Sequence, residues 1–180
     1  MTKPLNVELS TELAQTVKSQ AKTCFDNAHR AALVTKGAKY VQGFLVYAGS
    51  PYKPIEYSWL ELEDCLVDPT FPHLHKDADR LFYFPAQRLT VKQLKAAIDE
   101  AQEDYPDDEA LPVYGDAPYE FYGDRMLGGK EYALAFSEAE AKCKELNKPS
   151  NKPKVMNSDA TDALEPLPEP SPNSSQDLNG

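Results

Sequence analysis

The strongest constraint on the fold is a series of short strand-like segments between two helical regions. Residues 39–48 (KYVQGFLVYA) do not alternate cleanly between apolar and polar, which predicts a strand buried on both faces. The turn sequence GSPYKP separates it from residues 55–62 (IEYSWLEL), where Ile55, Tyr57 and Trp59 share one face. Strands joined by so short a turn pair antiparallel, so we expect an antiparallel sheet.

Further elements follow from the same kind of pattern. A third strand (CLV) comes after the turn Glu63-Asp64 and ends at Asp68, and a fourth (RLFYF) follows the loop PTFPHLHKDAD. Helical periodicity and capping residues predict helical segments after Ser10 or Thr11, over Cys24–Val34, after Thr90 and over 130–146. The pattern does not distinguish one bent helix from two for the first two segments. This order predicts an α+β fold, with N-terminal helices packed on a small antiparallel sheet and further helices after it.

The 180 residues divide into one domain and a tail. Residues 1–146 hold all the periodic segments and are expected to form a single α+β domain. Residues 147–180 contain six prolines and no aromatic residue. Such a composition buries too little apolar area to offset its ordering entropy, so we predict a disordered, Pro-rich acidic tail.

Charge and cysteine content restrict the partners and the compartment. The formal net charge is −10, which repels a phosphate backbone, so we expect no nucleic-acid partner and regard a basic protein as better suited. The N-terminus has no apolar signal region and no run approaches ~18 apolar residues, so we expect no membrane partner. The three cysteines show no metal or disulfide spacing, which predicts a cytoplasmic protein. Without a phosphate-binding loop or similar motif, no cofactor is expected.

One group of residues has the order expected of a thiol hydrolase. Such an enzyme needs a thiolate, a base that takes its proton and a group that orients the base. Cys24 lies at the start of a predicted helix, where the helix dipole lowers a thiol pKa. The strands that follow carry Tyr57 and Asp68.

These segments resemble known proteins. CFDNAHRAAL, KYVQGFLV and YSWLELEDCLVDPT are similar to the Cys–His–Asp order of papain-like and transglutaminase-like (NlpC/P60-type) proteins. They are most similar to small bacterial and phage proteins of unknown function that read Cys-Phe-x-Asn-Ala, Tyr-Val-x-Gly, His-Ala-Trp and Asp-Pro-Thr. The resemblance covers roughly residues 22–85. It implies a papain-like core, with Cys24 in the nucleophile position and Asp68 as the orienting acid.

The chain departs from this pattern at the base. Tyr57 stands where the resemblance places a histidine, and a tyrosine pKa of about 10, against about 6.5 for histidine, leaves it protonated at neutral pH. We therefore expect a pseudoenzyme: a non-catalytic, degenerate cysteine-hydrolase-like, cytosolic protein-binding module of phage or plasmid type. The alternative is an active cysteine hydrolase or acyltransferase that uses Cys24, Asp68 and a substitute base, His73 or His75.

Two other segments offer candidate sites. The loop YGDAPYEFYGD carries Tyr114, Tyr119, Phe121 and Tyr122, which together with Trp59 are candidate protein-binding residues, because aromatic side chains give large, rigid contact area. Packing within the domain is the alternative for the loop, and a core position is the alternative for Trp59. The segment HLHKDAD spaces His73, His75, Asp77 and Asp79 by two, as a zinc site on a strand would require, but a solvated loop is favoured and no metal is expected.

Overall fold

The computed structural model describes residues 3–148 and has an α+β fold, as the sequence predicts. Its centre is a four-stranded sheet in the order β3-β2-β1-β4, in which each neighbouring pair is antiparallel. The strands are β1 (Lys39–Val46), β2 (Ile55–Glu61), β3 (Leu66–Val67) and β4 (Phe82–Thr90). The predicted antiparallel sheet is therefore confirmed.

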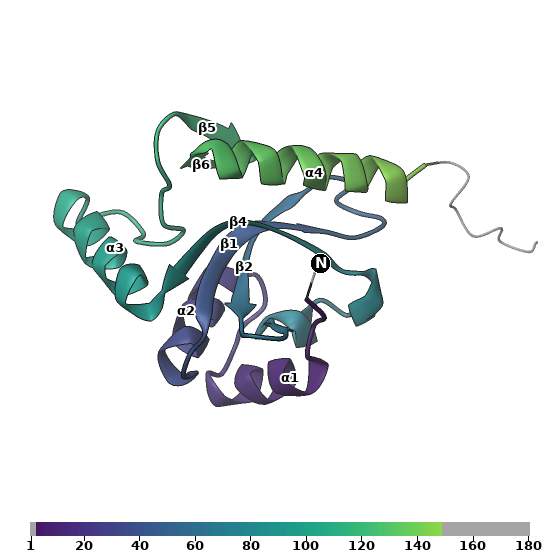
Figure 1. The fold of residues 1–180 in the computed structure, drawn as a ribbon, viewed down its shortest axis with the longest axis horizontal. Helices are drawn as coiled ribbons and strands as arrows, with labels where there is room; N and C mark the ends of the chain where they lie inside the picture. Colours follow the sequence, from purple (N-terminus) through teal and green to yellow (C-terminus); the bar gives the residue numbers. More distant parts are fainter. Residues whose placement is uncertain (1–2, 149–180) are drawn as a thin grey trace, which may run out of the picture.

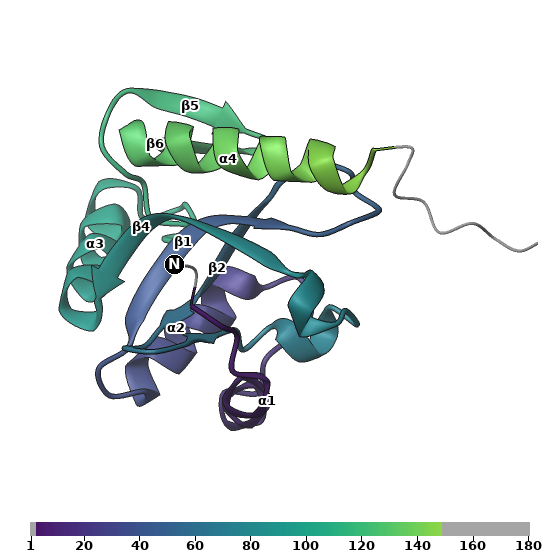
Figure 2. The same cartoon turned by 45° about the vertical axis from the view of Figure 1, so that its right-hand side comes forward.

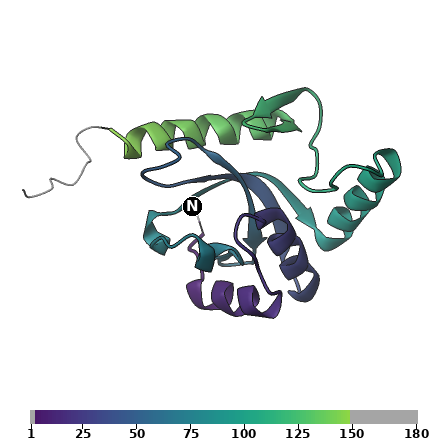
Figure 3. The same cartoon turned by 180° about the vertical axis from the view of Figure 1, so that it is seen from behind.

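The helices lie around this sheet. They are α1 (Val7–Thr16), α2 (Cys24–Val34), α3 (Val91–Asp104) and α4 (Lys130–Leu146). In Figure 1, α4 lies at one end of the molecule, α1 and α2 lie at the other, and the sheet runs between them. The rotated views in Figures 2 and 3 keep this separation, and α3 projects to one side.

Side-chain caps set the starts of α1 and α3. Thr90 caps α3 as predicted: its Oγ1 accepts from the Gln93 amide at 3.3 Å, and Gln93 Oε1 accepts from the Thr90 amide at 2.9 Å. The predicted start of α1 at Ser10 or Thr11 is wrong. Asn6 caps this helix by accepting from the Leu9 amide at 3.0 Å, and Ser10 lies buried inside it, donating to the Asn6 carbonyl.

Strand β1 is buried on both faces, as its sequence predicts. Phe44 packs against α4 and the second, smaller sheet. Leu45 packs in a different cluster, with Tyr57, Trp59 and Tyr83. The hairpin register pairs Gly43 with Tyr57. Ile55, Tyr57 and Trp59 thus belong to one apolar cluster, as the predicted shared face requires.

Strand β4 is longer than the predicted segment RLFYF and runs on to Thr90. Pro85 interrupts the strand pattern in the sequence, but β4 is an edge strand and the β1–β4 register shifts between Gln42 and Gly43. Edge strands and bulges tolerate proline, because no ladder donor is needed there. Gly43 is required at this point, since a Cβ atom on it would lie 2.0 Å from the Phe84 carbonyl oxygen.

The segment predicted as an aromatic loop contains a hairpin. Strands β5 (Tyr119–Tyr122) and β6 (Arg125–Gly128) pair antiparallel and form the second sheet. Gly123 begins the two-residue turn with a φ of +70°, which suits a tight hairpin. The loop before β4 likewise contains two 3-10 turns, Phe71–His73 and Ala78–Arg80.

Only the first two residues of the predicted tail are described. Asn147 follows α4 and ties it to the β1–β2 turn: its Nδ2 donates to the Cys143 carbonyl at 2.8 Å, and its Oδ1 accepts from the Gly49 amide at 2.9 Å. The prediction of disorder for the remainder lies outside the described residues.

Within residues 3–148, each helix is too short or too polar to cross a membrane.

Candidate functional site

Asp68 is the centre of a buried polar cluster. Its side chain is fully buried directly after β3. Oδ1 accepts from the Thr70 amide at 2.8 Å, and Oδ2 accepts from the Tyr83 hydroxyl at 2.9 Å. The Tyr57 hydroxyl lies 3.2 Å from Oδ2 and 3.4 Å from Oδ1. The structure therefore brings together Tyr57 and Asp68, the base position and the acid of the resemblance.

The electrostatics of this cluster keep both tyrosines protonated. Burial raises the pKa of Asp68 to about 6, against the opposing effect of its hydrogen bonds from Thr70, Tyr83 and Tyr57. Burial, reinforced by the negative charge of Asp68, raises the pKa of Tyr57 and of Tyr83 well above the ordinary value. At neutral pH the carboxylate accepts and the tyrosines donate, so neither tyrosine can take a proton from a thiol.

Cys24 lies in the same apolar cluster as Tyr57 and Tyr83, at the first residue of α2. Its side chain is buried, and burial raises the pKa of the thiol to about 12, with a further contribution from Asp68. Backbone hydrogen bonds at Ser58, Phe25 and Cys24 lower this pKa by a smaller amount. The backbone at the helix start thus acts in the expected direction, but desolvation of the thiolate has the larger effect and the pKa of Cys24 is raised.

The sequence fragments that carry the resemblance meet around Asp68. Asn27 Nδ2 donates to Thr70 Oγ1 at 3.0 Å, which joins the Cys-Phe-Asp-Asn-Ala fragment to the Asp-Pro-Thr fragment. The Asp68 amide donates to Ser10 Oγ at 2.9 Å, which adds α1 to the cluster. The Trp59 ring lies 5.1 Å from the Tyr83 ring. These residues hold Asp68 in place from several elements.

Within residues 3–148, neither His73 nor His75 forms a hydrogen bond with the Cys24 thiol. His73 Nε2 lies 2.9 Å from Ser19 Oγ and 3.1 Å from the Ser19 carbonyl oxygen. His75 is exposed, with a φ of +51°. The hydrogen-bond partner of His73 is thus in the segment after α1, and the alternative of a borrowed base gains no support from this geometry.

The spacing that suggested a metal site is lost in the structure. The 3-10 turns place His73 and Asp79 in separate turns rather than on one strand face, and Asp77 pairs with Arg80 at 3.3 Å. Among residues 3–148, no group of three or more His, Cys, Asp or Glu side chains could hold a metal ion.

The candidate binding residues divide by burial. The exposed fractions are 49% for Tyr114, 48% for Tyr119 and 73% for Phe121, so these three are accessible. Tyr122 and Trp59 are 4% and 0% exposed, which removes them from any contact surface. Tyr122 turns inward at the end of β5, where its ring packs on aromatic side chains of β1 and α4. Trp59 lies in the core cluster around Asp68.

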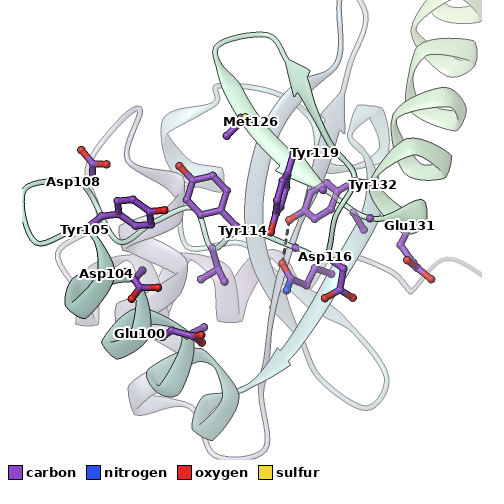
Figure 4. Close-up of a pocket in the computed structure, with 18 residues that line it drawn as sticks. Glu100, Asp104, Tyr105, Asp108, Tyr114, Asp116, Tyr119, Met126, Glu131 and Tyr132 are labelled. Carbon is purple, nitrogen blue, oxygen red and sulfur yellow. Dashed lines mark hydrogen bonds between the residues drawn. The ribbon is translucent and has the colours of Figure 1, made fainter.

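A cavity lies elsewhere, between α3, the segment that follows it, the β5–β6 hairpin and the start of α4. Its volume is about 760 Å³. Figure 4 shows Tyr105, Tyr114, Tyr119 and Tyr132 in a row across it. Five carboxylates line it as well: Glu100, Asp104, Asp108, Asp116 and Glu131. We call this cavity the tyrosine cleft. Sequence reasoning found two of its tyrosines but not the cleft, although the acid-dense end of α3 was a visible signal.

A buried glutamine holds one wall of the tyrosine cleft. Gln42 on β1 is 1% exposed. Its Nε2 donates to the Val113 carbonyl at 2.8 Å and to the Tyr132 hydroxyl at 2.7 Å, and its Oε1 accepts from the Val113 amide at 2.7 Å. The segment between α3 and β5 is thereby fixed to the sheet beside Tyr114.

Another cavity, of about 480 Å³, lies beside the start of α2 and has both basic and acidic residues in its walls. Thr23, Phe25 and His29 line it, and burial lowers the pKa of His29. Neither cavity is lined by Cys24, Tyr57 or Asp68. Cys24, Tyr57 and Asp68 are instead buried in the domain, with exposed fractions of 7%, 5% and 0%.

No protein-family model matches this chain, and no curated protein and no solved structure matches it. The resemblance to papain-like and transglutaminase-like proteins accordingly stays a prediction from short sequence fragments.

Proposed function

We propose that this chain is a non-catalytic, protein-binding module of the cytoplasm, with a degenerate thiol-hydrolase-like cluster at Cys24. The observation that carries the proposal is the set of contacts around Asp68. Tyr57, at the position where the resemblance places the base, donates to Asp68, while the Cys24 thiol is buried in the same cluster.

The chemistry of the cluster around Asp68 supports the proposed lack of catalysis. Burial raises the pKa of the Cys24 thiol to about 12, so the thiol stays protonated at neutral pH. A hydrolase would need a base to remove the thiol proton, and Tyr57 instead holds its own proton against Asp68. The cluster therefore contributes packing contacts and hydrogen bonds to the interior of the domain.

The exposed aromatic side chains support the proposed binding of a partner protein. Phe121 is 73% exposed on β5 and pairs across the hairpin with Met126, which is 40% exposed. Tyr114 and Tyr119 are half exposed nearby, with ring centroids 6.2 Å apart. Exposed aromatic and methionine side chains gathered on one surface are typical of protein-binding sites.

The thiol half is tested by the alkylation rate of each cysteine against pH, resolved by peptide mass spectrometry. We expect native Cys24 to react as slowly as the buried Cys143, and both to react quickly after unfolding in urea. Rapid native alkylation of Cys24 with a midpoint below about 8.5 would contradict the proposal and favour an active cysteine hydrolase.

The binding half is tested by affinity capture from an extract of the cells in which the protein occurs. We expect Phe121→Ser to lose a partner that both the unmodified chain and Leu134→Ser retain. Leu134 is the matched control, because it is 61% exposed on α4 and likewise apolar. Equal capture by the two variants would count against the hairpin as the binding surface.

A further inference from the structure

We propose that the tyrosine cleft binds an arginine- or lysine-containing segment of a partner protein. This inference rests on the proposed function, which it deepens by naming the chemistry of the partner. The acidic rim and the aromatic walls of the cleft both favour a cationic side chain, and one wall is held in place by hydrogen bonds.

All charged side chains that line the cleft are acidic. Five carboxylates line it, and its walls contain no lysine, arginine or histidine. The ion pairs within residues 3–148 use other acidic residues, so none of these five carboxylates is neutralised by such a pair. Figure 4 shows Glu100, Asp104 and Asp108 on the α3 side and Asp116 and Glu131 on the other side. A cation placed between the two groups is attracted from both directions.

The aromatic rings between the carboxylates suit a cationic side chain. Tyr105 is 61% exposed, and Tyr114 and Tyr119 are each about half exposed, so their rings are accessible from the cleft. A guanidinium or ammonium group over such a ring gains a cation–π contact, and guanidinium also stacks on it. The rings thus add an attraction that a plain acidic surface lacks.

The wall of the cleft beside Val113 and Tyr132 is fixed before a ligand arrives. The Gln42 side chain forms hydrogen bonds with the backbone amide and carbonyl of Val113. Its Nε2 also donates to the Tyr132 hydroxyl. A cleft that is already ordered loses little conformational entropy on binding. Its volume of about 760 Å³ is in the range of ligand sites and can hold one or two long side chains.

The surroundings favour a protein segment over a free amine. Met126 lines the cleft and pairs across the hairpin with exposed Phe121, so the apolar surface continues beyond the acidic rim. An extended peptide that places a basic side chain in the cleft can cover this surface with its neighbouring residues. A nucleic acid would be repelled by the same carboxylates.

The test is a titration of the full chain, labelled with ¹⁵N, with a heptapeptide of alternating glycine and arginine, acetylated and amidated at its ends. The matched probe replaces each arginine by citrulline, which keeps the shape and removes the charge. We expect the arginine peptide to shift amides of α3, the 113–119 segment and the hairpin, with a dissociation constant at or below about 1 mM in low salt. The citrulline peptide should bind at least about fivefold more weakly.

Two double variants locate the site. Glu100→Gln with Asp104→Asn removes two cleft carboxylates, and Asp99→Asn with Glu103→Gln removes the same charge from positions on the same helix that do not line the cleft. We expect the first pair to weaken arginine-peptide binding by about fivefold or more and the second by less than about twofold. All four residues are exposed, so both variants should fold.

Three results would overturn this inference: no binding of the arginine peptide, equal binding of the citrulline peptide, or equal weakening by the two double variants. Each would leave the proposed function standing, because that proposal is tested by cysteine alkylation and by capture with Phe121→Ser. Conversely, a reactive Cys24 would contradict the non-catalytic function without removing a measured site for basic peptides.

Discussion

The hydroxyl of Tyr83 on β4 lies 2.9 Å from Asp68 Oδ2, closer than the hydroxyl of Tyr57 on β2, which lies 3.2 Å from the same oxygen. Asp68 directly follows β3, and β3 and β4 are the opposite edges of the four-stranded sheet. The carboxylate thus joins segments from both edges of the sheet. Tyr83, which the sequence patterns did not indicate, makes the shorter contact.

The two tyrosines should differ in their contribution to stability. We expect Tyr83→Phe to lower the free energy of unfolding at pH 7.5 by about 1.5–3 kcal/mol, because it removes a hydrogen bond to a charged group. Tyr57→Phe should cost less, since its contacts are longer. Urea unfolding of both variants measures the difference. An equal or larger loss in Tyr57→Phe would show that the shorter contact is not the stronger one.

Asp68 should make the stability depend on pH. Burial raises its pKa from 3.8 to about 6 in the folded protein, so the folded state binds this proton more tightly than the unfolded state. This contribution stabilises the fold fully below pH 3.8 and is lost as pH rises through about 6. The total change is about 3 kcal/mol.

Asp68→Asn removes this titration. We expect the stability of the variant, relative to the unmodified chain, to increase between pH 4 and pH 7 by up to about 3 kcal/mol, added to a constant offset from the altered hydrogen bonds. Urea unfolding across this pH range gives the comparison. A constant difference between the two proteins would mean that Asp68 titrates in the folded state as in the unfolded one.

Gly43→Ala should be strongly destabilising. The new Cβ atom would meet the Phe84 carbonyl oxygen at 2.0 Å and the Ala86 amide nitrogen at 2.9 Å, so β1 and β4 would have to separate. We expect a loss of about 3 kcal/mol or more in thermal or urea unfolding. Gly37→Ala is the control: it has a φ of +79° but no atom within 4 Å, and should cost only about 1 kcal/mol. Equal losses would indicate that β4 moves easily.

Gln42→Met should loosen the wall of the tyrosine cleft. The substitution leaves the Val113 amide and carbonyl and the Tyr132 hydroxyl without the partner that Gln42 supplies, at a cost of about 2–4 kcal/mol. Hydrogen exchange of the Val113 amide should accelerate strongly. Gln87→Met removes one longer contact to Tyr132, at 3.3 Å, and should leave this exchange rate nearly unchanged. Slow exchange in Gln42→Met would contradict the role assigned to Gln42.

The local sequence determined much of the fold. Apolar spacing and turn residues predicted the β1–β2 hairpin, the strand before Asp68 and the α+β class, because hydrogen bonding and burial in these elements depend on near neighbours in the chain. Thr90 and Gln93 likewise fixed the start of α3. The start of α1 was misplaced, because Ser10 is a good capping residue by type but is buried inside the helix.

The candidate site depended more on tertiary structure. The order of Cys24, Tyr57 and Asp68 along the chain indicated that they would meet, but not that burial would raise the pKa of the thiol. Tyr83 joined the cluster from the far edge of the sheet, and β4 continued past Pro85 only because it pairs at an edge with a register shift.

By itself, then, the sequence determined the β1–β2 hairpin, the start of α3 and the class of fold, whereas the replacement of a histidine by Tyr57 stays a prediction from the resemblance. Only the tertiary structure decided that Cys24, Trp59 and Tyr122 are buried, and that tyrosines and carboxylates from α3, the segment after it, the hairpin and α4 share one cleft. The physical reason is that desolvation and charge proximity depend on residues distant in the chain, which local patterns do not encode.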